Sequence, residues 1–217
     1  MSARDLVERC WDGVTLRQGC AGPAAAAVLG DLVQTYGEPH RHYHTLGHIG
    51  ALLALLDRHG RGAADPDALR LAILFHDVVY DPTRHDNEPV SAAVATERLT
   101  RLGFPAALVA KVAHCIIATR HDRPADAMGD ADLALLVDLD LSILAAAPGD
   151  YRAYAGAVRR EYAFVPEHQY RPGRRRILEG FLARERIYLT EPLRALWEEP
   201  ARANLAAESA ALAEVLT

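Results

Sequence analysis

The chain has 217 residues, of which 50% are hydrophobic and 24% are charged, a balance typical of a water-soluble globular protein rather than a disordered one. Its formal net charge of -5 argues against general binding of nucleic acid, which requires a basic surface to neutralise phosphates. The three cysteines lack CxxC spacing, and the amino terminus lacks a secretory signal. No apolar run reaches the length of about 18 residues that spans a membrane. We therefore predict a cytoplasmic protein that does not enter a membrane.

Helical patterns extend along the whole chain, and no alternating run of β-branched residues is long enough to predict a strand. Helices are predicted in chain order at 4–12, 23–36, 45–59, 66–78, 87–102, 105–120, 130–144, 150–162, 166–183 and 192–215, the last with an interruption near Pro200. Proline in the first turn, as at Pro23 and Pro66, and glycine after the last turn, as at Gly60, support these bounds. We therefore predict an all-α fold of one compact domain.

A cluster of four histidines lies around the start of the predicted helix 45–59. Its members are His40, His42, His44 and His48. His44 and His48 are four positions apart and share a helical face if the helix begins early enough. A single histidine on an apolar face is most often a core residue with a satisfied hydrogen bond. The density of this cluster favours a ligand site instead.

His76 and Asp77 follow an apolar run in the segment RLAILFHDVVYD, residues 70–81. Leu69, Ala72, Ile73 and His76 have the spacing i, i+3, i+4, i+7, which predicts that the His76 imidazole lies on the buried stripe of a helix. A buried carboxylate at Asp77 costs several kcal/mol unless it is paired. A divalent cation would satisfy both side chains.

Two further acids, Asp138 and Asp140, interrupt the apolar segment LLVDLDLSIL. On a helix the two carboxylates point in different directions, because Asp138 shares a face with Ser142 and Asp140 shares one with Leu144. One acid could be a metal ligand and the other a helix cap, and the residues after Asp140 are typical of those that follow an N-cap. The spacing leaves the two roles open.

The ordered set of His48, His76, Asp77 and Asp138 resembles the H…HD…D arrangement of the HD-domain metal-dependent phosphohydrolases. The segments RHYHTLGHI, FHDVVYDP, DNEPVSA and EYAFVP are similar to a bacterial branch of that superfamily, the predicted metal-dependent HD phosphohydrolases. The similarity covers most of the chain. It implies a single HD-type helical bundle over 1–217, with the metal-site core at about 36–145 and the C-terminal helices 150–217 packed on it.

The resemblance makes His48, His76, Asp77 and Asp138 the ligands of a divalent cation. Two imidazoles and two carboxylates suit Mn, Fe, Co, Ni, Zn or Mg, so the identity of the metal stays open. Because Asp140 lies two positions beyond Asp138, either acid could align with the last ligand of the family. We favour Asp138.

Five residues outside the ligand set have weaker functional signals. Asp86 and Glu88 lie at a predicted helix start, where acids ordinarily cap the helix, but the resemblance also makes them candidate catalytic residues. His121 is a better candidate than His114 for a second metal site or for protonating a leaving group. We expect Arg41 to contact a phosphate, because it lies beside the histidine cluster and a guanidinium suits phosphoryl oxygens.

The resemblance predicts a phosphohydrolase that uses a metal-activated water against a nucleotide or another small phosphate ester. Glu88 or His121 would protonate the leaving oxygen. Two alternatives stay open: a binding or regulatory module that keeps the metal without turnover, and a di-iron oxygenase, which would need a second site through His114 or His121. The amphipathic segment at the carboxyl end could pack on its own domain or on a second subunit, which would give a homo-oligomer.

Overall fold

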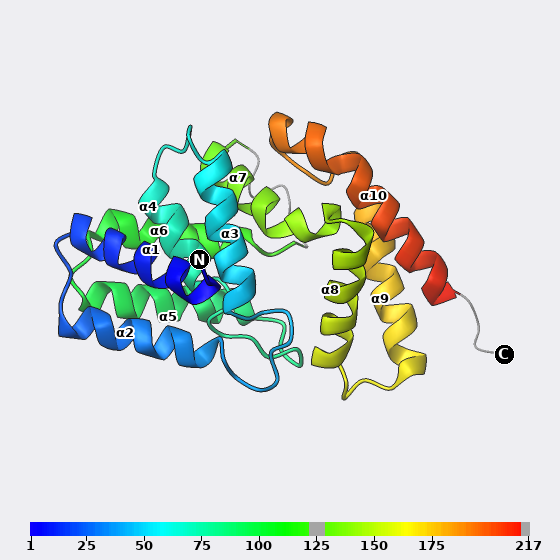
Figure 1. Cartoon of the computed structure of the whole chain (residues 1–217), viewed down its shortest axis with the longest axis horizontal. Coiled ribbons are helices and arrows are strands. Elements are labelled where there is room, and N and C mark those ends of the chain that lie inside the picture. Colours follow the sequence, from blue (N-terminus) through cyan, green and yellow to red (C-terminus); the bar gives the residue numbers. More distant parts are fainter. Residues whose placement is uncertain (122–128, 214–217) are drawn as a thin grey trace. The chain divides into compact units, whose positions relative to one another are not determined.

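The computed structural model describes residues 1–121 and 129–213, and every regular element in these two stretches is helical (Figure 1). The elements in chain order are α1 (Ala3–Arg17), α2 (Pro23–Thr35), α3 (Leu46–His59), α4 (Pro66–Phe75), α5 (Asn87–Arg101), α6 (Ala106–Ala118), α7 (Ala131–Asp140), the 3-10 helix η2 (Leu141–Ala145), α8 (Pro148–Glu161), α9 (Glu167–Leu182) and α10 (Glu191–Ala213). The predicted all-α fold is confirmed.

The chain divides into two compact units, Met1–Leu139 and Asp140–Thr217. The single domain expected over 1–217, with its C-terminal helices packed on a core, stays a prediction. Within the described stretches no helix is both long and apolar enough to cross a membrane. The cytoplasmic location and the homo-oligomer also stay predictions.

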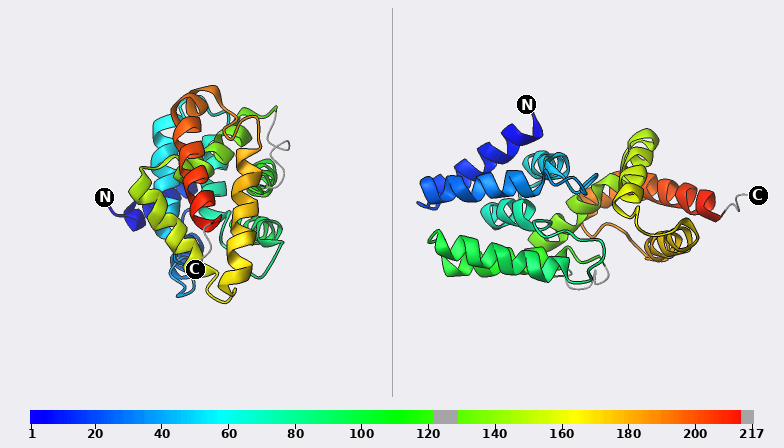
Figure 2. Two further views of the ribbon diagram at one scale, coloured as in Figure 1. Left: turned by 90° about the vertical axis from the view of Figure 1, so that its right-hand side faces the viewer. Right: turned by 90° about the horizontal axis from the view of Figure 1, so that it is seen from below.

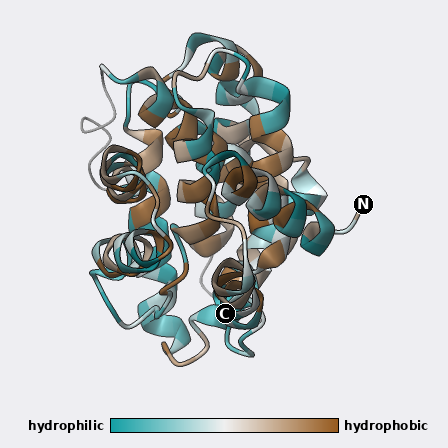
Figure 3. Cartoon of the chain, turned by 90° about the vertical axis from the view of Figure 1, so that its left-hand side faces the viewer, coloured by the Kyte–Doolittle hydropathy of each residue, from teal (hydrophilic) through white to brown (hydrophobic). Residues whose placement is uncertain are grey.

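Helix α4 forms the centre of the first unit, where it contacts α1, α3, α5 and α6. Pro66 occupies its first turn, and the Asp65 carboxylate accepts a hydrogen bond from the Ala68 N–H, so the helix begins with a satisfied N-terminus. Residues 71–75 are each at most 1% exposed. Because residues 71–75 are covered on all sides, this part of α4 is apolar all round, whereas the polar residues Asp67 and Arg70 before it are half-buried. Apolar residues gather where the helices of this unit face one another (Figure 3).

Helix α1 continues beyond its predicted end at residue 12, through Gly13 to Arg17. Glycine disfavours a helix interior, but the turn that follows buries Val14 completely. On the same helix Trp11 packs against Phe75 of α4, with ring centroids 6.1 Å apart. Tertiary packing of this apolar face therefore extends the helix past the residue at which local propensity predicts its end.

Helices α5 and α6 run side by side in the first unit (Figure 2). In the second unit α10 packs against α9 and η2. The Asn204 side chain of α10 donates hydrogen bonds to the carbonyls of Leu144 and Ala146, at 2.9 and 2.8 Å. Helix α10 continues through Pro200, where the sequence predicts an interruption. The carbonyl that Pro200 leaves without a helical donor belongs to Leu196, a residue that is 58% exposed.

Candidate metal centre

His48 is positioned by the first turn of α3. The Thr45 hydroxyl accepts a hydrogen bond from the Gly47 N–H at 3.2 Å, so Thr45 is the N-cap and fixes where the helix begins. His48 is 7% exposed and lies among the buried residues Ile49 and Leu52. His44 precedes the N-cap and is therefore outside the helix, so the shared helical face predicted for His44 and His48 does not form.

His76 and Asp77 lie at the carboxyl end of α4, where the last carbonyls have no helical partner. The His76 backbone N–H donates to the Ala72 carbonyl, and the His76 Nδ1 lies 3.0 Å from the Ile73 carbonyl oxygen. Since a carbonyl can only accept, Nδ1 carries the hydrogen in this bond. In the neutral imidazole Nε2 is then left with its lone pair, which is the form that binds a metal.

Three potential ligand atoms converge between α3 and the end of α4. The His48 Nε2 lies 3.3 Å from the His76 Nε2 and 3.7 Å from the Asp77 Oδ2, and the last two atoms are 3.0 Å apart. Ligands bound to one cation at about 2.1 Å are separated by about 3.0 Å in octahedral and about 3.4 Å in tetrahedral geometry. The three atoms can therefore contact one cation together, and their burial fits a site that needs one.

The environment of Asp77 favours its ionised form. Burial alone would raise the pKa of this carboxyl, but when His76, His44 and His48 are protonated their charges, with the hydrogen bond that protonated His76 donates, outweigh burial and hold the pKa well below its usual range. The Asp77 side chain is 17% exposed, more than either imidazole of the group. An ionised carboxylate that solvent can reach is suited to receive a divalent cation.

Asp138, the predicted fourth ligand, is completely buried on α7. Asp132 lies in the first turn of this helix, and its carboxylate oxygens accept hydrogen bonds from the backbone N–H groups of Ala64 and Asp65, at 2.8 and 2.9 Å. This contact fixes the start of α7 against the start of α4. Asp138 is not among the three converging ligands, and its role as a ligand stays a prediction. Asp140 ends α7 at the N-cap position of η2, without a capping hydrogen bond from its side chain.

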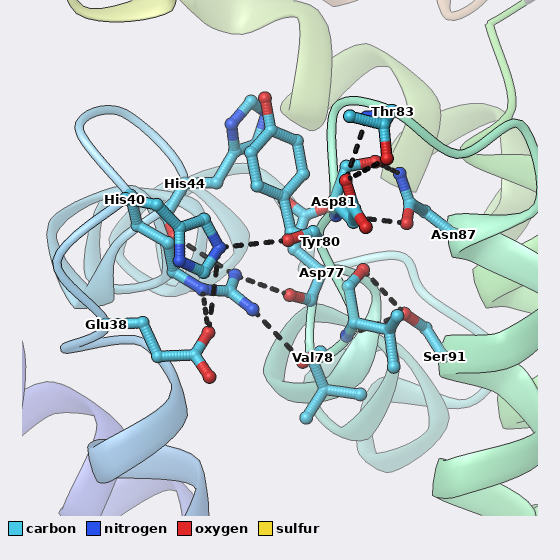
Figure 4. A network of polar contacts seen from close by, with 12 residues as sticks. Glu38, His40, His44, Asp77, Val78, Tyr80, Asp81, Thr83, Asn87 and Ser91 are labelled. Carbon is cyan, nitrogen blue, oxygen red and sulfur yellow. Dashed lines mark hydrogen bonds and ion pairs between the residues drawn. The ribbon is translucent and has the colours of Figure 1, made fainter. Parts of the chain in front are cut away.

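Arg41, expected to contact a phosphate, is engaged with the protein instead. Its side chain is 1% exposed, and its guanidinium donates to the Glu38 carboxylate and to the backbone carbonyls of His44, Asp77 and Val78. Figure 4 shows these contacts around Asp77 and Val78. Four of its five N–H donors act inside the protein, so the geometry supports a structural role in place of the expected phosphate contact.

The other predicted catalytic residues lie outside the three-residue group, and their catalytic roles stay predictions. Asp86 occupies the N-cap position of α5 but is exposed and forms a bidentate ion pair with Arg84. Glu88 is half-buried in the first turn of the same helix. His121 is half-buried directly before the undescribed residues 122–128, and His114 is exposed on α6. Within the described stretches the group of His48, His76 and Asp77 is the one cluster suited to a metal.

Two residues of α5, Asn87 and Ser91, hold the segment after the HD pair (Figure 4). The Ser91 hydroxyl exchanges hydrogen bonds with the Val79 N–H and carbonyl, at 3.1 and 3.3 Å. The Asn87 side-chain amide accepts a hydrogen bond from the Asp81 N–H at 3.1 Å and donates one to the Asp81 carbonyl at 2.9 Å. The sequence carries a signal for this role, because Asn87 and Ser91 are four positions apart and share one face of a helix.

The His44 and Tyr80 rings stack beside the site, with centroids 4.0 Å apart. The His40 Nε2 donates to the Tyr80 carbonyl at 3.1 Å. The histidine cluster thus contributes one residue to the ligand group, His48, and two residues that contact Tyr80. No sequence pattern indicates these contacts, since about forty positions separate the partners.

The middle of the chain matches a known protein family. Residues 41–146 match the family model described as the HD domain. No curated protein and no solved structure shows significant similarity to the chain. The matched region begins at Arg41 and includes His48, His76, Asp77 and Asp138.

Proposed function

We propose, since this chain belongs to the HD-domain superfamily, that it is a metal-dependent phosphohydrolase acting on a nucleotide or another small phosphate ester. The observation that carries the proposal is the convergence of the His48 Nε2, the His76 Nε2 and the Asp77 Oδ2 within 3.0 to 3.7 Å of one another. This donor set fits a divalent cation, and the same chemistry does not distinguish Mn, Fe, Co, Ni, Zn and Mg.

His48, His76 and Asp77 would hold the cation, with the buried Asp138 as the proposed fourth ligand. When bound, such a cation supplies an activated water at neutral pH and stabilises negative charge on a phosphate group. The Ile73 carbonyl holds neutral His76 in the tautomer that binds a metal, and the imidazoles around Asp77 favour its ionised form when they are protonated. The site is therefore organised by the protein before any cation enters.

A proton must also reach the leaving oxygen of the ester. Glu88 and His121 are the proposed donors, a role that typically contributes about 10²- to 10⁴-fold to the rate. Both side chains are half-buried in the first unit. Replacing each residue separately, as Glu88→Gln and His121→Gln, and comparing kcat values would assign the role to one of them.

The test is hydrolysis of a panel of nucleoside phosphates and generic phosphate mono- and diesters, with Mn, Co, Ni or Mg added. We expect turnover of at least one ester, and its loss in Asp77→Asn. His85→Ala is the matched control, because His85 is an exposed histidine in the loop that precedes α5. Metal binding without turnover of any ester would favour the binding or regulatory module, and two irons per chain would favour the oxygenase.

A further inference from the structure

The segment that follows α4 has backbone carbonyls that no helix satisfies. Helix α4 ends at Phe75, so the carbonyls of Asp77, Val78 and Tyr80 need donors from elsewhere, and a buried carbonyl without a donor is costly. Side chains from the segment between α2 and α3 supply them. His40 donates to Tyr80, and Arg41 donates to both Asp77 and Val78.

The same segment reaches the last turn of α4 itself. The Tyr36 hydroxyl donates to the Leu74 carbonyl at 3.0 Å, in a buried contact. Tyr36, His40 and Arg41, termed here the 36–41 clasp, therefore hold four carbonyls in the stretch 74–80, which contains two of the metal-ligand candidates.

Arg41 makes the most consequential contacts of the clasp. A single nitrogen, Nη1, lies 2.7 Å from the Asp77 carbonyl and 3.3 Å from the His44 carbonyl. His44 directly precedes Thr45, the N-cap of the helix that carries His48. One nitrogen thus joins the backbone at Asp77 to the start of α3. These two places carry Asp77 and His48, whose Oδ2 and Nε2 atoms lie 3.7 Å apart.

The surroundings hold the guanidinium in place. Its central carbon lies over two aromatic rings, 5.2 Å from the Tyr36 centroid and 5.7 Å from the Tyr80 centroid. Its Nε donates to the Glu38 carboxylate at 2.9 Å, which compensates the buried charge. Lysine cannot reproduce this arrangement, since an ammonium is a compact point charge without the planar fork that reaches several acceptors.

We propose that Arg41 is a positioning residue that sets the separation between His48 and Asp77, and so determines the affinity of the site for a divalent cation. The inference rests on the proposed metal site but not on the proposed hydrolysis. Arg41 acts through the backbone of Asp77 and through the start of α3, and it does not contact the substrate.

The experiment is calorimetric titration of the metal-free protein with Mn²⁺, for the wild type and Arg41→Lys, at a temperature where circular dichroism shows both to be folded. Residues that orient metal ligands typically contribute 10- to 100-fold to affinity, so we expect Arg41→Lys to bind Mn²⁺ about 10- to 100-fold more weakly. Glu38→Gln removes the negative charge of a 42% exposed side chain but keeps an amide oxygen that can accept from Nε, and it is expected to change the affinity less than about threefold.

Arg174→Lys separates positioning from stability. Arg174 is also a buried arginine, paired with Glu208 at 2.8 Å in the second unit, so its replacement is expected to lower the stability without changing Mn²⁺ affinity. If Arg41→Lys fails to fold, Tyr36→Phe removes a single hydroxyl of the clasp and is expected to weaken Mn²⁺ binding about threefold or more.

If Arg41→Lys binds Mn²⁺ as tightly as the wild type, the positioning role is overturned and the proposed function still stands. If Arg41→Lys does not fold, the same conclusion follows from equal Mn²⁺ affinity in Tyr36→Phe and the wild type. Absence of Mn²⁺ binding by the wild type would overturn both. Metal binding weakened in Arg41→Lys but without hydrolysis of any ester would support the positioning role and count against the phosphohydrolase.

Discussion

The Nε2 atoms of His48 and His76 lie 3.3 Å apart, although 28 positions separate the two residues in the sequence. Because the Nδ1 of His76 is bonded to the Ile73 carbonyl, the Nε2 of the neutral ring presents a lone pair towards His48. The fold thus directs donor atoms from two helices and the Asp77 carboxylate to one point. A divalent cation at that point would stabilise the arrangement.

Metal binding should therefore raise the thermal stability of the protein. A ligand present at 100 times its Kd and absent from the unfolded state stabilises the native state by about 2.7 kcal/mol, which corresponds to an increase in Tm of about 5 to 10 °C. Calorimetry with and without Mn²⁺ measures the shift, and a chelator should reverse it. The same increase in Asp77→Asn would show that the cation binds elsewhere.

Asp138→Asn should weaken metal binding, because it replaces a completely buried carboxylate by a neutral side chain of the same shape. The loss of one ligand from four is expected to lower the affinity more than about 10-fold. Asp140→Asn is the matched control, two positions away and half-buried. Titration of both variants with Mn²⁺ decides between the two acids, and a loss confined to Asp140→Asn would reverse the assignment.

The ion pair between Asp67 and Arg17 should make stability depend on pH. Burial would raise the pKa of Asp67, but hydrogen bonds from Arg17 and Gln18 outweigh it and lower the pKa below its ordinary value. Because the pKa of Asp67 is lower in the native than in the unfolded state, its ion pair stabilises the protein when the pH is above the unfolded-state pKa of about 3.9. This stabilisation is lost as the pH falls through the native pKa.

Asp67→Asn should accordingly cost about 1 kcal/mol at pH 7 and nothing in acid, below the native pKa of Asp67. Urea unfolding of both proteins across this pH range provides the comparison. Asp57→Asn serves as the control, since Asp57 is largely exposed and lies 3.6 Å from Arg70. A cost for Asp67→Asn that does not vary with pH would refute the contribution of this pair.

Two of the three thiols should be unreactive in the native state. Burial raises the pKa of Cys10 and of Cys115 to about 12, so almost none of either thiol is ionised at pH 8. Cys115 is buried, whereas Cys10 on α1 and Cys20, between α1 and α2, are both half-buried. A disulfide reagent at pH 8 should modify one thiol quickly, and Cys20→Ser should remove that fast phase. Rapid modification of all three thiols would contradict the raised pKa values of Cys10 and Cys115.

Much of the helical pattern could be predicted because the ends of the helices carry local chemistry. Pro23 and Pro66 begin α2 and α4, and Gly60 follows the end of α3, as the sequence indicates. Two helices continue through a residue that disfavours a helix interior. Burial of Val14 carries α1 through Gly13, and α10 continues through Pro200.

The site could be predicted only in part. His48, His76 and Asp77 were identifiable because polar groups in apolar segments need partners, and the structure brings these three together. The position of Arg41 was not predictable, since its acceptors are backbone carbonyls, which every residue has and no sequence pattern marks. An arginine beside histidines is equally typical of a phosphate contact and of such a structural role.

The central claim is that His48, His76 and Asp77 bind one divalent cation. Elemental mass spectrometry of protein loaded with Mn²⁺ and then dialysed tests it most directly, with Asp77→Ala and the exposed control His85→Ala prepared in parallel. One cation per chain in the wild type and in His85→Ala, with none in Asp77→Ala, is the predicted result. Equal metal content in Asp77→Ala and the wild type, or none in the wild type after loading with Mn, Co, Ni, Zn or Fe, would contradict the claim.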